Sequence, residues 1–134
     1  MKKKFLSVII PVFNEQETIL KILKKINLVE IQKEVIIIND GSLDKTDSII
    51  KQHTDLYDHY ISYSQNKGKG FACKLGISKA SGEVIIIQDA DLEYNPKNYH
   101  TLVNKYLNNK NIKAVYGSRV AKGGRNIKPS GIRP

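Results

Sequence analysis

The chain has 134 residues, which fits a single domain that buries a real hydrophobic core. Apolar residues make up 40% of it and charged residues 26%, a balance that excludes an intrinsically disordered chain. No apolar run approaches the ~20 residues needed to span a bilayer. A single cysteine, Cys73, excludes an intrachain disulfide and a cysteine-based zinc site, and it suits a cytoplasmic protein. The net charge of +9 attracts polyanions, but a lysine-rich solubilising surface explains it without any specific partner.

The first predicted elements are a strand and a helix. Residues 6–10 form a nearly continuous apolar run, which is typical of a strand buried on both faces. Asn14, with Glu17 three residues later, fits the start of a helix closed by a capping box. Apolar residues then recur at helical spacing, which predicts an amphipathic helix to about residue 28.

The same order repeats in the next segment. Residues 34–39 predict a second buried strand, and the Asp-Gly-Ser sequence at 40–42 predicts a turn. Residues 44–52 predict a second helix, and residues 60–63 a weaker third strand.

The remaining elements continue the alternation. Residues 66–70, which contain two glycines and two lysines, predict a loop that opens a helix at 71–79. Residues 83–88 predict a fourth strand, a proline near the start predicts a helix at 96–107, and residues 112–116 predict a fifth strand.

Strands that alternate with helices of this length predict an α/β fold with a mostly parallel sheet and helices on both faces. In such sheets, ligands bind at the carboxyl ends of the strands. We expect residues 1–121 to form this domain. Residues 122–134, rich in glycine, proline and basic residues, are expected to be a tail or the stump of a longer protein.

The segment after the fourth strand carries closely spaced carboxylates. Asp89 and Asp91 are two residues apart, so in extended backbone they project to the same side, roughly 6.5 Å apart. With Glu93 nearby, such a group suits Mg²⁺ or Mn²⁺. The alternative interpretation is a solvated acidic turn that caps the next helix.

Other strand ends carry weaker signals. Asp40 can accept hydrogen bonds from a base or a ribose, or it only starts an Asx-turn. Pro11 and Phe13 can form one wall of a base pocket, or they only end the first strand. Lys69, in a glycine-containing loop before a helix, suits an anion. Arg119 follows the fifth strand and can hold a phosphate, or it is simply exposed.

Five segments, in this order, resemble the ordered motifs of family 2 glycosyltransferases, and most closely those of dolichol-phosphate mannose synthases and bacterial polyprenyl-phosphate glycosyltransferases. The resemblance extends over nearly the whole chain up to Arg119. The segments are 7–15, 39–46, 66–70, 80–82 and 89–93. It implies a GT-A fold and an inverting transfer from a GDP- or UDP-sugar donor, with a polyprenyl phosphate as an expected acceptor.

The resemblance also implies a role for each matching residue. The base and ribose would lie among Pro11, Phe13, Glu15 and Asp40, with Phe13 where many members carry tyrosine. Lys69 and Arg119 would lie near the phosphates. Asp89, Asp91 and Glu93 would hold the cation, with Asp91 the more direct ligand, and Asp89 would also belong to the nucleotide site. Asp91 and Arg119 are the expected catalytic residues.

Two other functional classes predict different binding behaviour for this chain. In members that transfer to a hydroxyl, the base lies well downstream of the metal motif, beyond the end of this chain, so the acceptor-binding half is expected to be absent. A non-catalytic nucleotide-sugar-binding module would then bind the donor without transferring the sugar. A nucleic-acid-binding domain would ignore Mn²⁺, but the chain lacks a helix-turn-helix or an aromatic RNA-binding motif, so nucleic acid is not an expected partner. For the polyprenyl branch, we expect the cytoplasmic face of the membrane.

Dehydrogenase and receiver domains fit less well. Reading from Gly68, the third glycine of a dinucleotide fingerprint would fall on Cys73. The acidic pair follows the fourth strand, whereas a receiver domain would carry it after the first.

Overall fold

The computed structural model describes residues 5–91, 96–108 and 114–116. In this part the elements alternate as predicted, and short 3-10 turns precede β3 and α4. The order is β1 (Leu6–Val12), α1 (Ile19–Asn27), β2 (Lys33–Asp40), α2 (Thr46–Lys51), η1 (Thr54–Leu56), β3 (His59–Tyr63), α3 (Lys69–Lys79), β4 (Val84–Ile87), η2 (Pro96–Asn98), α4 (Tyr99–Asn108) and β5 (Ala114–Tyr116).

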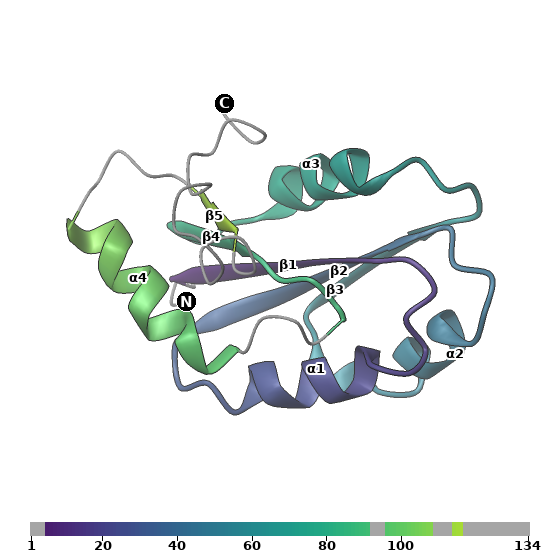
Figure 1. Ribbon diagram of the computed structural model, residues 1–134, viewed down its shortest axis with the longest axis horizontal. Helices are drawn as coiled ribbons and strands as arrows, with labels where there is room; N and C mark the ends of the chain where they lie inside the picture. Colours follow the sequence, from purple (N-terminus) through teal and green to yellow (C-terminus); the bar gives the residue numbers. More distant parts are fainter. Residues whose placement is uncertain (1–4, 92–95, 109–113, 117–134) are drawn as a thin grey trace.

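The strands of the described residues form one sheet in the order β3-β2-β1-β4-β5 (Figure 1). Each neighbouring pair is parallel, so all carboxyl ends lie at one edge. The prediction of an α/β fold with a parallel sheet is therefore confirmed. β1 lies at the centre, and it pairs with β2 along its whole length.

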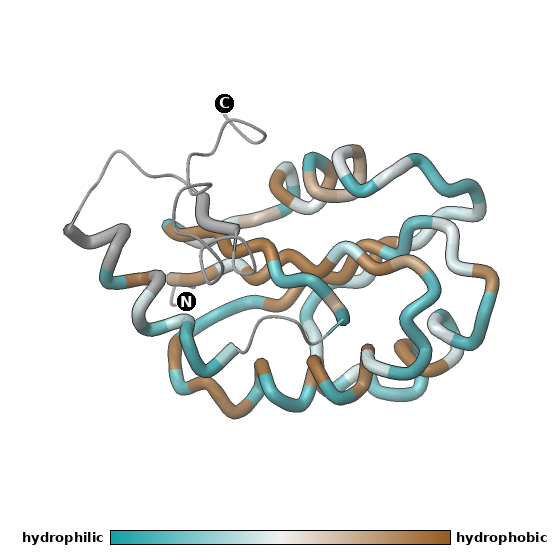
Figure 2. Tube along the Cα trace, in the orientation of Figure 1, coloured by the Kyte–Doolittle hydropathy of each residue, from teal (hydrophilic) through white to brown (hydrophobic). Residues whose placement is uncertain are grey.

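Helices cover both faces of the sheet. Among the described helices, α3 is the one that packs on one face, against β1 and β2, with Ala72 and Cys73 buried there beside Ile9 and Ile38. On the other face, α1 buries the apolar stripe predicted from its spacing. Ile50 of α2 and Tyr99 of α4 join the same core. Figure 2 shows apolar residues concentrated along the central strands, as expected of strands covered on two sides.

The start of the first helix differs from the prediction. α1 begins at Ile19 rather than near Asn14, and Asn14 has a φ of 52°, which lies outside helical geometry. The capping-box prediction is therefore wrong. The tail predicted at 122–134 lies outside the described residues, as do Glu93 and Arg119.

Candidate functional site

The carboxyl ends of β1 and β4 separate beyond their last paired residues. Their register ends at Ile9 and Ile87, and the Gln88 N–H donates to the Ile9 carbonyl over 2.8 Å. In a strand, the backbone N–H and C=O groups of residues two apart point toward the same neighbouring strand. The backbone of Pro11 therefore points toward β4, as that of Ile9 does, at a position where the pairing has ended. Proline has no N–H to donate, which suits this position. The sheet continues from β1 to β2 on one side and to β4 on the other. Parallel sheets form ligand crevices at such a switch point.

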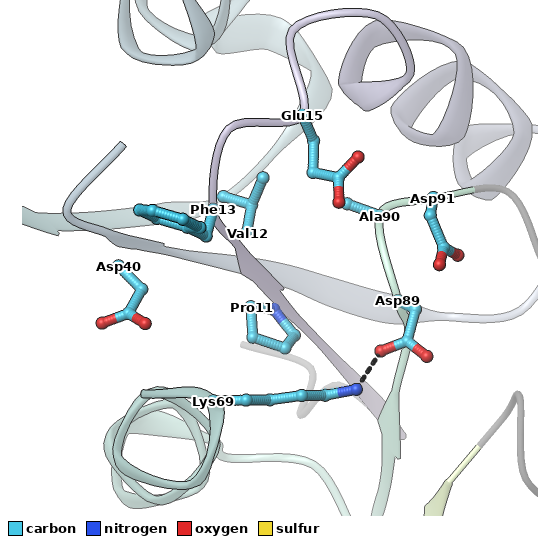
Figure 3. Close-up of a pocket in the computed structure, with 9 residues that line it drawn as sticks. All are labelled: Pro11, Val12, Phe13, Glu15, Asp40, Lys69, Asp89, Ala90 and Asp91. Carbon is cyan, nitrogen blue, oxygen red and sulfur yellow. Dashed lines mark hydrogen bonds and ion pairs between the residues drawn. The ribbon is translucent and has the colours of Figure 1, made fainter. Parts of the chain in front are cut away.

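A pocket of about 290 Å³ lies in this crevice (Figure 3). Its lining comes from β1 and the loop after it, the end of β2, the first turn of α3 and the segment after β4. The lining residues are Pro11, Val12, Phe13, Glu15, Asp40, Lys69, Asp89, Ala90 and Asp91. The structure thus brings together seven of the nine site residues expected from the sequence, and the other two lie outside the described residues.

Charge distinguishes this pocket from the chain as a whole. Its lining carries four carboxylates but a single ammonium, whereas the chain has a net charge of +9. An anionic pocket repels a phosphorylated ligand unless a cation enters with it. The pocket is therefore suited to a cation and its anionic partner together.

Asp40, at the end of β2, organises the loop between β3 and α3. One carboxylate oxygen accepts the Lys67 N–H over 2.8 Å. The other accepts the Gly68 N–H and the Asn66 side-chain amide, each over 3.0 Å. Burial raises the pKa of the Tyr63 hydroxyl, and the negative charge of Asp40 raises it further, so Tyr63 also lies beside this carboxylate. Asp40 is also part of the pocket lining, as is Phe13 (Figure 3).

Gly41 allows this loop to come close to the end of β2. Its φ is +75°, a conformation that glycine adopts without strain. A Cβ at this position would lie 2.5 Å from the Asn66 backbone nitrogen. Any other residue would therefore push the loop away from Asp40.

Lys69 is the first residue of α3, and it reaches across the pocket. Its ammonium forms an ion pair and hydrogen bond with one oxygen of Asp89 (Figure 3). The Lys69 side chain is 51% exposed and that of Asp89 18% exposed. Because Lys69 directly follows the loop bound by Asp40, that loop determines where this lysine enters the pocket.

Glu15 and Thr18 connect the loop after β1 to the segment after β4. The Thr18 hydroxyl lies 2.5 Å from the Ala90 carbonyl and 3.2 Å from a Glu15 carboxylate oxygen. Burial raises the pKa of Glu15, the Thr18 hydroxyl opposes this, and the negative charges of Asp91, Asp44 and Asp89 raise it further. The raised pKa of Glu15 therefore comes first from burial, and the neighbouring carboxylates add to it.

Gln88 holds the start of the segment that carries Asp89 and Asp91. It is fully buried, and its side-chain amide donates to the Asp89 carbonyl over 3.1 Å. Its side-chain oxygen accepts the Tyr99 hydroxyl over 2.7 Å. α4 therefore helps to place the carboxylates, a role that the sequence analysis did not assign to either residue.

Asn14 is a second residue whose role the sequence analysis missed. Its side-chain oxygen accepts the Leu43 N–H over 2.7 Å, and its own N–H donates to the Ser42 hydroxyl over 2.9 Å. The Glu15 N–H donates to the Thr46 hydroxyl over 2.9 Å. These bonds join the loop after β1 to the loop after β2. Since asparagine tolerates positive φ, its position after a strand was an available signal for such a turn.

The described carboxylates fit a hard divalent cation in part. Among the residues that the structure describes, no group of three or more His, Cys, Asp or Glu side chains is placed to hold a metal ion. Mg²⁺ is often held by one or two protein carboxylates, with phosphate oxygens and waters completing the shell. Asp89 and Asp91 therefore suit such a cation when it comes with a phosphate ligand.

Comparison with known proteins identifies the family. The chain matches glycosyl transferase family 2 over residues 7–133. The chain belongs to this family. The resemblance predicted from the sequence motifs is thereby confirmed, and similar proteins include a dolichol-phosphate mannosyltransferase and an undecaprenyl-phosphate 4-deoxy-4-formamido-L-arabinose transferase.

Two relatives illustrate the similarity. An uncharacterized glycosyltransferase of Synechocystis is 35% identical over 128 residues, which is 89% of this chain and 39% of the relative. The dolichol-phosphate mannosyltransferase of Pyrococcus furiosus is 32% identical over 122 residues, which is 89% of this chain and 34% of the relative. The chain thus spans little more than a third of the length of these relatives.

A solved structure supports the GT-A fold of the family 2 chain. A mannosyltransferase from Pyrobaculum calidifontis, solved with GDP-Man and Mn²⁺, superposes with a TM-score of 0.68 at 25% identity. The match covers 80% of this chain and 33% of that one. In the described part of the family 2 chain, no helix is long and apolar enough to cross a membrane.

Proposed function

We propose that this family 2 chain forms the donor-binding part of a metal-dependent inverting glycosyltransferase that uses a GDP- or UDP-sugar. The observation that carries this proposal is the anionic pocket at the β1–β4 switch point, with an aromatic wall on one side and Asp89, Asp91 and Lys69 on the other (Figure 3). A nucleoside diphosphate has a flat base at one end and a charged diphosphate at the other. Its two ends thus match the aromatic side and the charged side of the pocket.

The base and ribose would occupy the Phe13 side of the pocket. Phe13 is 42% exposed, although it is a large apolar side chain, and Pro11 forms the pocket wall beside it. An exposed ring of this kind suits stacking on a base. The carboxylates of Asp40 and Glu15 would then accept from ribose or base donors.

The diphosphate would lie beside Asp89 and Asp91. Mg²⁺ or Mn²⁺ held there would offset the charge that develops on the leaving diphosphate. Lys69, at the first turn of α3, would bind a phosphate oxygen together with the helix N-terminus. Glu93 and Arg119 are proposed as the third cation ligand and a second phosphate-binding group, as the family resemblance implies.

For the acceptor we propose a polyprenyl phosphate at the cytoplasmic face of a membrane. Support comes from the Pyrococcus furiosus relative, whose name specifies dolichol phosphate. A phosphate acceptor is already an anion, so it would need no carboxylate base. The alternative is a module that binds the donor without transferring the sugar.

Isothermal titration of the full chain with UDP and with GDP, each with Mn²⁺ and with EDTA, tests the donor site. We expect one nucleotide to bind with Mn²⁺ and not with EDTA. Asp91→Ala should abolish this binding and leave the circular dichroism spectrum unchanged, because Asp91 is exposed. Asp55→Ala removes one exposed carboxylate far from the pocket, and it should bind like the wild type.

The outcomes separate the two candidate functions. Binding of neither nucleotide by a folded chain would refute the proposal. Metal-dependent binding without transfer from the matching nucleotide-sugar to a polyprenyl phosphate would favour the binding module. Retention of Mn²⁺-dependent binding by Asp91→Ala would refute the assignment of the cation site.

A further inference from the structure

The ion pair between Lys69 and Asp89 lies at the point where the proposed cation and the proposed diphosphate meet. The Lys69 ammonium contacts Oδ1 of Asp89, a carboxylate that the proposed cation would also bind. Lys69 also belongs to the first turn of α3, where phosphate would be favoured. One lysine can therefore serve either partner.

We propose that Lys69 exchanges partners when the donor binds: its ammonium leaves Asp89, which then accepts the cation, and moves to the diphosphate. This inference rests on the proposed donor site. The lysine is thereby a positioning residue that couples the two binding events, because the cation and the ammonium compete for Asp89 until the diphosphate provides another anion.

The geometry permits the exchange without rearrangement of the backbone. The Lys69 side chain is 51% exposed, and its four-carbon stem has several rotatable bonds. Its backbone is held in place, since the preceding loop donates three hydrogen bonds to the Asp40 carboxylate and one to the Asp40 carbonyl. Movement is therefore confined to the side chain, and the ammonium remains within the pocket.

Electrostatics gives the direction of the coupling. With Lys69 on Asp89, an entering divalent cation meets a reduced negative charge and the repulsion of the ammonium. A diphosphate that attracts Lys69 removes both penalties. By linkage, the nucleotide should strengthen cation binding by the same factor by which the cation strengthens nucleotide binding.

Mn²⁺ binding to the full chain without nucleotide tests the exchange directly. Free Mn²⁺ is measured by electron paramagnetic resonance for the wild type and for Lys69→Met. Exposed ion pairs contribute little, so we expect the variant to bind Mn²⁺ about two- to fivefold more tightly. With UDP or GDP present, the strengthening of Mn²⁺ binding by nucleotide should be smaller in the variant by a similar factor.

Two further variants separate competition from local loosening. Lys69→Arg keeps the positive charge beside Asp89, so its Mn²⁺ affinity should match the wild type. Lys67→Met removes a nearby lysine whose ammonium lies 4.9 Å from the centre of the Phe71 ring. The Mn²⁺ affinity of this variant should also match that of the wild type. An affinity of Lys69→Met equal to or weaker than that of the wild type overturns the exchange, as does the absence of Mn²⁺ binding in both. Failure of nucleotide binding alone would refute the proposed function, while the Mn²⁺ comparison still tests the competition.

Discussion

At the scale of single residues, Phe13 and Phe71 offer a comparison that isolates the role of the pocket. Both side chains are 42% exposed, but only Phe13 lines the pocket. Phe71 instead packs edge-on against Tyr63, with 5.6 Å between ring centres. The two rings are thus matched in exposure and differ in what they face.

We predict that Phe13→Ala weakens Mn²⁺-dependent nucleotide binding by about 1–3 kcal/mol, the usual effect of removing an aromatic ring from a stacked base. Phe13→Tyr, which keeps the ring, should bind like the wild type, and so should Phe71→Ala. Titration calorimetry measures all four proteins. If Phe13→Ala binds the nucleotide as tightly as the wild type, the base does not stack on this ring.

At the scale of elements, the loop between β3 and α3 depends on a carboxylate from β2. Asp40 accepts from the backbone N–H groups of Lys67 and Gly68, which precede the helix. No pairing of strands holds this loop, so its position relies on Asp40 and on the close approach allowed by Gly41. Lys69 directly follows this loop, so the position of its side chain in the pocket depends on the loop.

We predict that Asp40→Asn lowers the free energy of unfolding by about 1.5–3 kcal/mol, because at least one donor then faces an amide NH₂ in place of a carboxylate oxygen. Urea denaturation followed by circular dichroism measures this change. Amide exchange of Lys67 and Gly68 should also accelerate. The matched change Asp55→Asn removes a charge from an exposed side chain and should cost little. A cost below about 0.5 kcal/mol for Asp40→Asn would show that the loop holds its position without the carboxylate.

At the scale of the whole molecule, the sequence predicted more of the fold than of the site. The run of strands and helices follows from local patterns, and the strand-end rule drew attention to Asp89 and to Asp40. The order of the strands in the sheet does not follow from local patterns. The sequence therefore did not predict that the ends of β1 and β4, which are far apart in the chain, lie next to each other. The conformation of Asn14 could not be predicted for a different reason. Asparagine is favoured both as a helix N-cap and at positive φ, so the residue type alone does not distinguish the two.

The opposite end of the sheet has a buried carboxylate of its own, Glu34, which is 4% exposed. It accepts the Ser7 hydroxyl over 2.6 Å, the Ser81 N–H over 2.6 Å and the Ser81 hydroxyl over 3.0 Å, and His59 lies 3.7 Å away. It therefore joins β1, β2 and the turn before β4. Burial alone would raise the pKa of Glu34, but these hydrogen bonds and His59 outweigh it and hold the pKa below the usual value of 4.5.

A pKa that is lower in the folded than in the unfolded chain gives stability that is present above pH 4.5 and is lost as the pH falls through the folded value. We therefore predict that Glu34→Gln, which does not titrate, is less stable than the wild type at pH 7, and that this difference narrows as the pH is lowered from 5 to 3. Urea denaturation at each pH measures the two free energies of unfolding. Other carboxylates titrate in both proteins and largely cancel, so the narrowing reports Glu34 itself. A difference that stays constant across this range would mean that the folded chain does not hold Glu34 in its charged form more strongly than the unfolded chain does.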